Sequence, residues 1–418
     1  MRIGIISPVA TADVRHLLDV GDVMPLPPGY PGAPFIATLI TTYLGMGHDV
    51  VAFTSDRSLH PSNDPQYLDG PGFRLWLCPA RPNGTFPRHG RLGRICDFFS
   101  LERQKLALAV AQEKIDILHA HWTYEFAMVA QESGIPAIAT MHDVPEDILR
   151  FTLSPYYFGR YLMARRILAR GLPLTVVSGY LADRLAQKGI SPADVIANPL
   201  PVWLKDLEPV RGGFPVNGRF PVISMVAGYW NGFKNPLPGI KAFANIRQTT
   251  GQAPELHLYG PDFGPNGKAE KYIRAAGVRL DGIKLRGGVP HRKLLEKLSG
   301  SDALVHTAIT ESFGMAVAEA MALGVPIIGG IRSGAIPWLL EHGAAGQLVD
   351  VMDVAAVEAA ILRVLQRPDE IRVLASHAQK RIWQIASPEA IAGQYLNAYH
   401  RVLNNLILPH QDTYQGLA

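Results

Sequence analysis

Strand-like apolar runs alternate with helix-like patterns along the whole chain. In the first half these runs lie at 2–7, 49–55, 73–78, 116–121, 136–142 and 174–178. In the second half they lie at 222–228, 255–260, 283–288, 303–307, 326–330 and 347–350. Parallel strands need long crossover connections, and helices usually supply them. The alternation therefore predicts an α/β fold with a parallel sheet in each half.

The length of the chain predicts two domains. A chain of 418 residues is too long for one ordinary hydrophobic core. The segment 197–202, ANPLPV, contains two prolines and begins a linker that we expect to continue through 210–219. We therefore expect an N-terminal domain over 1–200 and a C-terminal domain over 201–386, followed by a helix that begins near SPEAI, from Ser387.

The composition excludes several classes of protein. A hydrophobic content of 48% and a charged content of 18% are typical of a well-packed globular protein. Cys78 and Cys96 cannot form a disulfide framework and lack metal-ligand spacing, so we expect a reducing, cytoplasmic location. The first ten residues do not resemble a signal peptide, and we expect no membrane span because no run of 18 apolar residues occurs. The net charge of +4 forms no basic stripe, so nucleic acid is not an expected partner.

Two glutamates stand out in the apolar stretch ITESFGMAVAEAMALGVPIIGG. Glu311 and Glu319 are costly there unless something pairs with them. If the segment were helical throughout, about 12 Å would separate them, which suits the two ends of an extended polar ligand. Gly314 would let the ligand approach the backbone where a helix begins, and helix N-termini favour phosphates. The alternative is a strand, a turn and a helix with one surface-reaching glutamate.

The same stretch resembles a known family signature. The runs TESFGM, 310–315, and EAMALGVP, 319–326, are similar to the donor-binding motif of the retaining glycosyltransferases of family four, and SGAIP, 333–337, extends the match. The resemblance implies the GT-B fold, in which two Rossmann-like domains face each other across a cleft. It also implies that a C-terminal helix over about 387–408 crosses back onto the N-terminal domain. A helix that covers only the second domain is the alternative.

The resemblance assigns roles to the residues of the motif. It implies that Glu311 contacts the donor sugar and that Glu319 contacts the ribose hydroxyls. The backbone amides of Phe313, Gly314 and Met315 would line the sugar and the diphosphate.

A second donor-binding loop follows the first strand of the C-terminal domain, in GYWNGFKN. Family members usually carry an arginine directly after the glycine and a lysine five residues later, both on the diphosphate. Lys234 matches the lysine, whereas Tyr229 stands where the arginine is expected. Arg332 and Arg286 are the nearest candidates for the missing cation. A solvated surface lysine is the alternative for Lys234.

Two histidines lie at the end of a strand in IDILHAHW. His119 and His121 are two residues apart, so they point to one face of that strand, at the edge where α/β sheets bind ligands. The resemblance places His121 near the reacting sugar, with His119 as support, and His142 is a weaker candidate for the same cleft. Histidines that only cap the core are the alternative, and a zinc site is disfavoured because no fixed third and fourth ligands accompany them.

The loop LPPGYPGAP precedes the first long helix of the N-terminal domain. Many family members have a glycine pair here, close to the acceptor and the diphosphate. In this chain Gly29 and Gly32 are separated by Tyr30 and Pro31, which makes the loop longer and stiffer. A plain surface turn is the alternative.

Two arginine clusters remain. One consists of Arg81, Arg88, Arg91 and Arg94, and the other lies within 148–170, interleaved with aromatic residues. Such surfaces could hold a phosphorylated lipid acceptor or rest on an anionic membrane. An ordinary solvated helix is the alternative.

Together these features predict transfer of a hexose from a nucleotide-diphosphate sugar to a glycan or lipid-linked hydroxyl, with retention implied by the resemblance. The loop near Val289 would read the base. The sequence lacks a D-x-D triplet, so we expect no metal and no cofactor. The alternatives are a nucleotide-sugar epimerase of the same fold, a degenerate transferase suggested by Tyr229, and a two-domain sugar-binding protein. The expected location is the cytoplasm, with peripheral contact at the inner membrane face.

Overall fold

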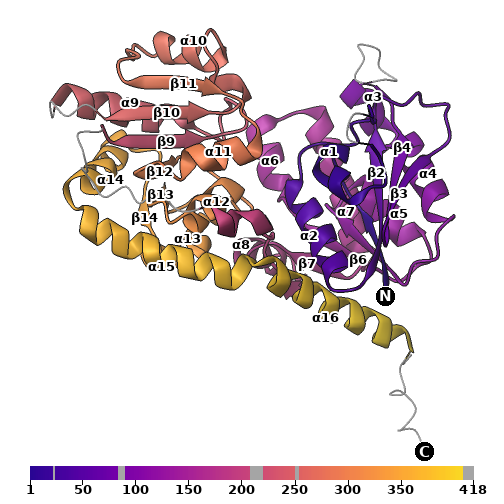
Figure 1. The fold of residues 1–418 in the computed structure, drawn as a ribbon. Helices are drawn as coiled ribbons and strands as arrows, with labels where there is room; N and C mark the ends of the chain where they lie inside the picture. Colours follow the sequence, from indigo (N-terminus) through magenta and orange to yellow (C-terminus); the bar gives the residue numbers. More distant parts are fainter. Residues whose placement is uncertain (22–23, 83–89, 208–219, 250–253, 408–418) are drawn as a thin grey trace, which may run out of the picture. The chain divides into compact units, whose positions relative to one another are not determined.

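The computed structural model describes residues 1–21, 24–82, 90–207, 220–249 and 254–407 (Figure 1). It divides into two compact units. Unit 1 comprises Met1–Val177, Leu181–Pro199 and Pro388–Ala418, and unit 2 comprises Ser178–Tyr180 and Leu200–Ser387. Both units are α/β, as the alternating pattern predicts. The part of the expected linker at 210–219 lies outside the described residues.

Unit 1 contains an eight-stranded sheet in the order β3-β4-β2-β1-β5-β6-β7-β8. Its strands are β1 (Arg2–Ile6), β2 (Asp49–Asp56), β3 (Gln66–Gly70), β4 (Phe73–Pro79), β5 (Ile117–His121), β6 (Ala137–Met141), β7 (Leu174–Val176) and β8 (Asp194–Val195). All neighbours are parallel except β3, which pairs antiparallel with β4. The apolar runs predict every strand but β3 and β8. The edge strand β3 is largely exposed and β8 has two residues, so neither carries an apolar run.

Helices cover both faces of this sheet. They are α1 (Thr11–Val14), α2 (Pro34–Gly45), α3 (Gly90–Cys96), α4 (Ser100–Val110), α5 (Glu125–Glu132), α6 (Pro145–Thr152), α7 (Pro155–Ala169), α8 (Gly179–Ala186) and the last helix, α16 (Pro388–Ile407). One face packs against α4, α5 and α7 through a cluster that includes Phe53 and Phe126. On α2 and α16, the buried hydroxyls of Tyr43 and Tyr399 are hydrogen-bonded at 2.8 Å. The last helix is thus an integral part of unit 1.

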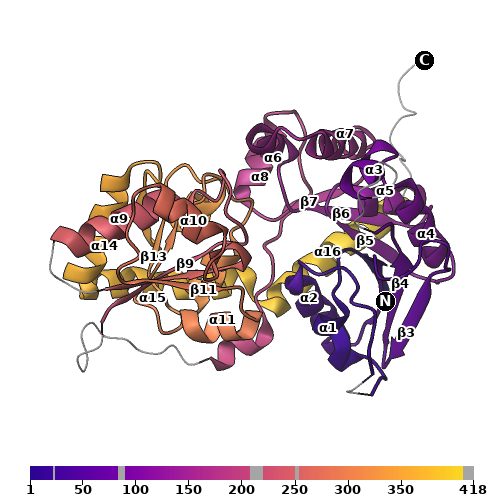
Figure 2. The ribbon, with the colours of Figure 1, turned by 90° about the horizontal axis from the view of Figure 1, so that it is seen from above.

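Unit 2 contains a six-stranded parallel sheet in the order β11-β10-β9-β12-β13-β14. Its strands are β9 (Val222–Val226), β10 (Glu255–Tyr259), β11 (Ile283–Gly287), β12 (Ala303–His306), β13 (Ile327–Gly330) and β14 (Gln347–Val349). Its helices are α9 (Pro236–Thr249), α10 (Lys268–Ala275), α11 (His291–Leu298), α12 (Met315–Ala322), α13 (Ile336–Leu339), α14 (Val354–Gln366) and α15 (Pro368–Ala386). Figure 2 shows α9 and α14 on one face of the sheet and α11 on the other.

The strand order of each sheet reverses at one point. In unit 1 the chain leaves β1 toward β2 on one side, and β5 lies on the other. In unit 2 the corresponding strand is β9, flanked by β10 and β12. The crevice outside the carboxyl ends of the strands at such a reversal is where open α/β sheets bind ligands. The loops after β1, β5, β9 and β12 are therefore the places to look for a site.

The described part of the chain was compared with what a membrane span and a metal site would need. None of its helices combines the length and the apolar character needed to cross a bilayer. Its histidine, cysteine and carboxylate side chains also form no group of three that could hold a metal ion.

Candidate active site

The loops after β9 and β12 are tied together at the strand reversal of unit 2. The backbone N–H of Ile309 donates to the carbonyl of Phe233 at 2.7 Å, and the side chain of Asn235 donates to the carbonyl of Thr307 at 3.2 Å. These bonds cross from one loop to the other. They hold Lys234, in the first loop, opposite the residues that follow β12.

A lysine and a histidine share one carboxylate in these loops. Lys234 Nζ lies 2.5 Å from Glu311 Oε1, and His306 Nε2 lies 3.1 Å from the same oxygen. Burial raises the pKa of Glu311, but Lys234 and His306 outweigh it and lower this pKa to about 2. Glu311 is therefore an ionised carboxylate near neutral pH. His306 was not among the predicted site residues, and its position at the end of an apolar strand was the available signal.

The helix of the signature motif begins later than the spacing estimate assumed. α12 starts at Met315, so Glu311 precedes the helix and the distance of about 12 Å derived for a continuous helix does not apply. Gly314 caps the helix with φ of 93°, and a Cβ there would lie 2.7 Å from Ile336. The left-handed backbone and this close contact both favour glycine. The expectation that a helix begins at Gly314 is thus correct, and the continuous helix on which the distance of about 12 Å depended does not form.

The segment SGAIP supports the loop that carries Glu311. Gly334 has φ of 59°, and a Cβ on it would lie 2.3 Å from the carbonyl oxygen of Glu311. The next residue, Ala335, donates its backbone N–H to that oxygen at 2.8 Å. The downstream part of the motif therefore fixes the backbone on which the catalytic candidate stands.

Glu319 is paired, as an acidic residue in an apolar run should be. It is 5% exposed, and its Oε1 lies 2.7 Å from Nε2 of His291, the first residue of α11. Trp203 packs edge-on against this imidazole at 5.9 Å between ring centroids. Sequence reasoning missed His291, because its pairing with Glu319 depends on how α11 packs beside α12.

Phe313 is buried and packs near Trp338.

The residues considered for the missing diphosphate cation lie apart from one another. Tyr229 is 62% exposed. Arg332 follows β13, next to β12, and pairs with Asp350. Arg286 lies on the edge strand β11, with Nη2 3.3 Å from Nε2 of His257, and Val289 is half-buried just after that strand. Strand order thus brings the loop of Arg332, and not Arg286, next to the Glu311 loop.

Unit 1 carries a row of buried imidazoles at the end of β5 and β6. The rings of His119 and His121 lie 4.0 Å apart, on one face as their spacing predicts. His119 is hydrogen-bonded on both nitrogens, to Tyr399 and Thr140, each at 2.7 Å. His121 Nδ1 lies 2.9 Å from His142 Nε2, whereas its Nε2 is buried and has no hydrogen-bond partner among the described residues.

These imidazoles are neutral near pH 7. Burial lowers the pKa of His119 and of His142 to about 3, and it lowers the pKa of His121 well below its usual value. Two neutral rings that share a hydrogen bond leave the outer nitrogen of His121 as either a donor or an acceptor. It is therefore suited to hold a hydroxyl group of a ligand.

The loop after β1 carries the two predicted glycines, Gly29 and Gly32, and it is tightly packed at the first of them. Gly29 has φ of 69°, and a Cβ there would lie 2.4 Å from the carbonyl oxygen of Val9. Its N–H donates to Asp56 Oδ2 at 2.6 Å. Gly32 has φ of 128° with open space around it. Packing and the left-handed backbone therefore both favour glycine at position 29, while at position 32 the backbone conformation favours it.

The first arginine cluster is largely interior. Arg81 pairs with Asp97 at 2.7 Å and with Glu102 at 2.6 Å. Arg94 is 2% exposed and donates to the carbonyl of Arg81 at 2.7 Å. The expectation of a binding surface is thus wrong for Arg81 and Arg94, because Asp97 and Glu102 engage the first and a backbone carbonyl engages the second. Arg88 lies outside the described residues.

Known proteins share both the sequence pattern and the fold. The model for "Glycosyl transferases group 1" matches residues 219–381, and the model for "Glycosyl transferase 4-like domain" matches residues 32–201. An MMP alpha-(1->4)-mannosyltransferase of Mycolicibacterium hassiacum is 27% identical, over 73% of this chain and 75% of that protein. A D-inositol 3-phosphate glycosyltransferase of Acidothermus cellulolyticus is 23% identical, over 87% and 85% of the two chains.

Solved structures agree in fold. A sucrose-phosphate synthase from Thermosynechococcus elongatus superposes with a TM-score of 0.73 at 20% identity, over 97% of this chain and 99% of that chain. Anabaena HepE in complex with UDP-glucose gives a TM-score of 0.65 at 17% identity, over 96% and 100%. The C-terminal half of the chain therefore matches the group 1 glycosyl transferases, the N-terminal half matches the glycosyl transferase 4-like domain, and the fold is the GT-B fold.

Proposed function

We propose that this glycosyltransferase moves a hexose from a nucleotide-diphosphate sugar to a hydroxyl group of a glycan or glycolipid, with retention and without a divalent metal. The observation that carries the proposal is the Lys234–Glu311–His306 arrangement at the strand reversal of unit 2. The names of the relatives support a sugar-transfer reaction, since they include a mannosyltransferase and an inositol-phosphate glycosyltransferase.

The diphosphate needs charge stabilisation more than it needs a general acid, because it leaves as an anion. Lys234 supplies a cation, and the backbone N–H groups at the start of α12 supply a favourable dipole. Glu311 holds Lys234 in place. Because His306 also contacts Glu311, the lysine can turn toward a diphosphate without leaving the carboxylate unpaired.

Glu319 is the candidate contact for the ribose. His291 fixes the orientation of its carboxylate through one oxygen. Each carboxylate oxygen has more than one lone pair, so ribose hydroxyls can donate to Glu319 while His291 stays bound. In unit 1, Nε2 of His121 has no hydrogen-bond partner among the described residues, and it is the candidate for holding a sugar hydroxyl.

Thermal-shift measurements against a panel of nucleoside diphosphates, followed by turnover assays in EDTA, test this proposal. A bound nucleotide should raise the melting temperature by mass action. Turnover that needs an acceptor and persists in EDTA supports a metal-independent transferase. Products formed from the donor alone would favour an epimerase. Nucleotide binding without turnover would favour a degenerate transferase, the alternative suggested by Tyr229.

Peripheral membrane contact stays part of the proposal. The helices α6 and α7 and the turn between them expose large apolar side chains in a segment that also carries arginines, which suits an anionic bilayer surface. These apolar residues are Phe151, Leu153, Phe158 and Leu162, exposed by 38%, 83%, 51% and 38%. Co-sedimentation with anionic and with neutral vesicles tests this contact. Loss of binding to anionic vesicles in Leu153→Ser/Phe158→Ser is expected, and equal sedimentation of this variant and the parent protein would contradict it.

A further inference from the structure

A largely buried arginine and a buried glutamate face each other in unit 1, and the described residues do not complete their hydrogen bonds. Arg160 lies on α7, and Glu125 is the first residue of α5. Gly159 lets α7 approach α3, since a Cβ on it would lie 2.1 Å from Ile95 Cγ1. This close packing fixes the turn of α7 that carries Arg160.

The guanidinium of Arg160 has more donors than the described residues satisfy. Its side chain is 15% exposed, and its Cζ lies 3.5 Å from the ring centroid of Tyr124. Nη1 donates to the hydroxyl of Tyr156 at 3.2 Å. An arginine offers five N–H donors, which exceed what the phenol oxygens of Tyr124 and Tyr156 can accept.

One oxygen of the Glu125 carboxylate has no hydrogen-bond donor among the described residues. Glu125 is 4% exposed, and its Oε2 is 3.8 Å from Arg160 Nη1, beyond hydrogen-bonding distance. This oxygen has no hydrogen-bond partner among the described residues, and the same holds for the buried hydroxyl of Thr123. A buried carboxylate oxygen without a hydrogen bond is costly unless a ligand supplies one.

Tyr30, from the loop after β1, borders the same pair. Burial raises the pKa of Tyr30, Glu125 raises it further, and Arg160 and Arg57 lower it, which places the phenol beside these charges. Arg57 lies over the Tyr30 ring, 5.0 Å from its centroid. The pair therefore lies where loops from the carboxyl ends of β1 and β5 meet, at the strand reversal of unit 1.

A ligand that completes this pair must donate to a carboxylate and accept from a guanidinium. Hydroxyl groups do both, and two neighbouring hydroxyls can do so at once. An ionised phosphate would satisfy Arg160 but would meet the negative charge of Glu125. Half-buried tyrosine rings at the border suit the apolar face of a sugar or cyclitol ring.

We propose that Glu125 and Arg160 form the acceptor-binding site of this transferase and that they select a neutral, hydroxyl-rich acceptor over a phosphorylated one. This inference rests on the proposed function and names its acceptor class. Glu125 accepts hydrogen bonds from acceptor hydroxyls, and Arg160 donates to them.

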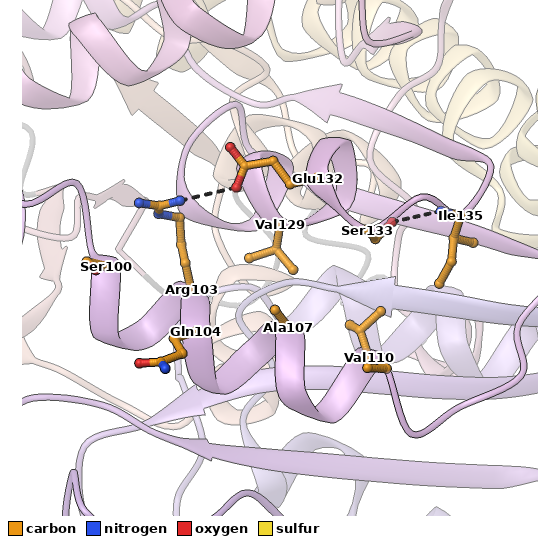
Figure 3. A pocket seen from close by; sticks show the side chains of 10 residues that line it. Ser100, Arg103, Gln104, Ala107, Val110, Val129, Glu132, Ser133 and Ile135 are labelled. Atoms are coloured by element: carbon orange, nitrogen blue, oxygen red, sulfur yellow. Dashed lines mark hydrogen bonds and ion pairs between the residues drawn. The ribbon is translucent and has the colours of Figure 1, made fainter.

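A second glutamate on α5, Glu132, lies beside a cavity and differs from Glu125 in being paired with arginines. A cavity of about 480 Å³ lies between α4 and α5, and Figure 3 shows Arg103 and Glu132 at its rim. Glu132 Oε2 lies 3.3 Å from Arg103 Nη1, and Glu132 Oε1 lies 3.2 Å from Arg170 Nη1. The carboxylate here is already satisfied by arginines. Glu132→Gln is therefore a matched control for Glu125→Gln, on the same helix and with the same chemical change.

The test uses the full chain and saturation-transfer NMR with methyl α-D-mannopyranoside, myo-inositol and myo-inositol 1-phosphate as probes. We expect at least one neutral probe to bind more tightly than the phosphorylated one. Glu125→Gln should weaken neutral-probe binding about tenfold and narrow the preference over the phosphorylated probe. Glu132→Gln should change neither. A purely structural role for Glu125 would lower all signals together without changing the preference.

Donor binding separates this inference from the proposed function. Nucleoside diphosphates should raise the melting temperature of Glu125→Gln as much as that of the parent protein. If nucleotides bind to neither protein, the proposed function fails. If nucleotides bind but the phosphorylated probe is preferred, or Glu125→Gln leaves probe preference unchanged, this inference fails. Should Glu125→Gln not fold, Arg160→Lys carries the test, with the same loss of neutral-probe binding expected and unchanged binding overturning the proposal.

Discussion

The polar groups at the strand reversal of unit 2 are paired with one another, whereas several at the reversal of unit 1 are buried and have no hydrogen-bond partner in the part of the chain that the structure describes. In unit 2, Glu311 contacts Lys234 and His306, and Glu319 contacts His291. In unit 1, the outer nitrogen of His121 and one oxygen of Glu125 lack hydrogen bonds among the described residues. The first arrangement preorganises charge, and the second leaves hydrogen-bonding capacity for a ligand.

The difference matches the chemistry expected at each place. A diphosphate brings concentrated negative charge, and a cation held in advance by a carboxylate needs little reorganisation to meet it. A neutral sugar brings only hydroxyls, so unsatisfied donors and acceptors in a dry site are what it can complete. The comparison therefore predicts that charge removal is most harmful in unit 2 and that changes of hydrogen bonding alter selectivity in unit 1.

The largest expected effect follows from removing the cation of unit 2. Lys234→Ala should lower kcat/KM by roughly 30- to 1000-fold, equivalent to about 2–4 kcal/mol of transition-state stabilisation. Lys380→Ala, at an exposed site on α15, is the control and should retain activity. Steady-state kinetics with saturating acceptor measure this. A Lys234→Ala enzyme with near-normal turnover would show that the leaving group is stabilised elsewhere.

Glu319→Ala should weaken nucleoside-diphosphate binding by about 1–3 kcal/mol, because a buried acceptor for ribose hydroxyls is lost. Isothermal titration calorimetry measures the change. Titration with the corresponding 2′-deoxynucleotide sharpens the result, since that ligand should lose less affinity on substitution than the ribonucleotide. Equal losses for the two ligands would make Glu319 a structural partner of His291 alone.

Acid should destabilise unit 1 through its neutral histidines. His119 binds a proton in the unfolded chain near pH 6.5 but in the folded protein only near pH 3, since its pKa is lowered to about 3. Below about pH 6.5 the unfolded state therefore binds more protons, and stability falls as the pH falls, by up to about 2 kcal/mol at pH 5. Above about pH 6.5 His119 is neutral in both the folded and the unfolded state, so its contribution to stability no longer changes with pH.

Urea unfolding at pH 7 and pH 5 tests this. His119→Gln should lose about 2 kcal/mol less than the parent protein between these values. His400→Gln, at an exposed position next to Tyr399, should lose as much as the parent. Equal pH dependence in all three proteins would show that His119 does not stay neutral when folded.

The smallest expected loss of activity comes from removing the two arginines considered as substitutes for the cation that is missing at Tyr229. Arg332 is 76% exposed and bound to Asp350, so Arg332→Ala should reduce kcat about tenfold or less. Arg286→Ala should do less still, because its strand lies at the edge of the sheet. A large gain of activity in Tyr229→Arg, with both arginines dispensable, would show that the diphosphate site has lost a charge.

The sequence predicted the fold better than the site. Strands follow local patterns of apolar residues, whereas side-chain ion pairs and hydrogen bonds join residues that are distant in the sequence. Apolar runs located both parallel sheets, while β3 escaped because its residues are mostly polar and exposed. The motif predicted that a helix begins at Gly314, and Glu311 lies in the loop before that helix. His291 could not be assigned, and the only signal for His306 was its place at the end of an apolar strand, since each histidine pairs with a carboxylate that folding brings close. Arg81 looked like a surface residue because its acids, Asp97 and Glu102, come later in the chain.

The most direct test of the central claim is an NMR assay of the reaction in EDTA. The full chain is incubated with a nucleotide-sugar donor that shifts its melting temperature and with methyl α-D-mannopyranoside or myo-inositol as acceptor. We expect acceptor-dependent release of nucleoside diphosphate and a new glycoside with the anomeric configuration of the donor. Products formed without an acceptor, an inverted anomer, or activity that returns only with magnesium or manganese would contradict it.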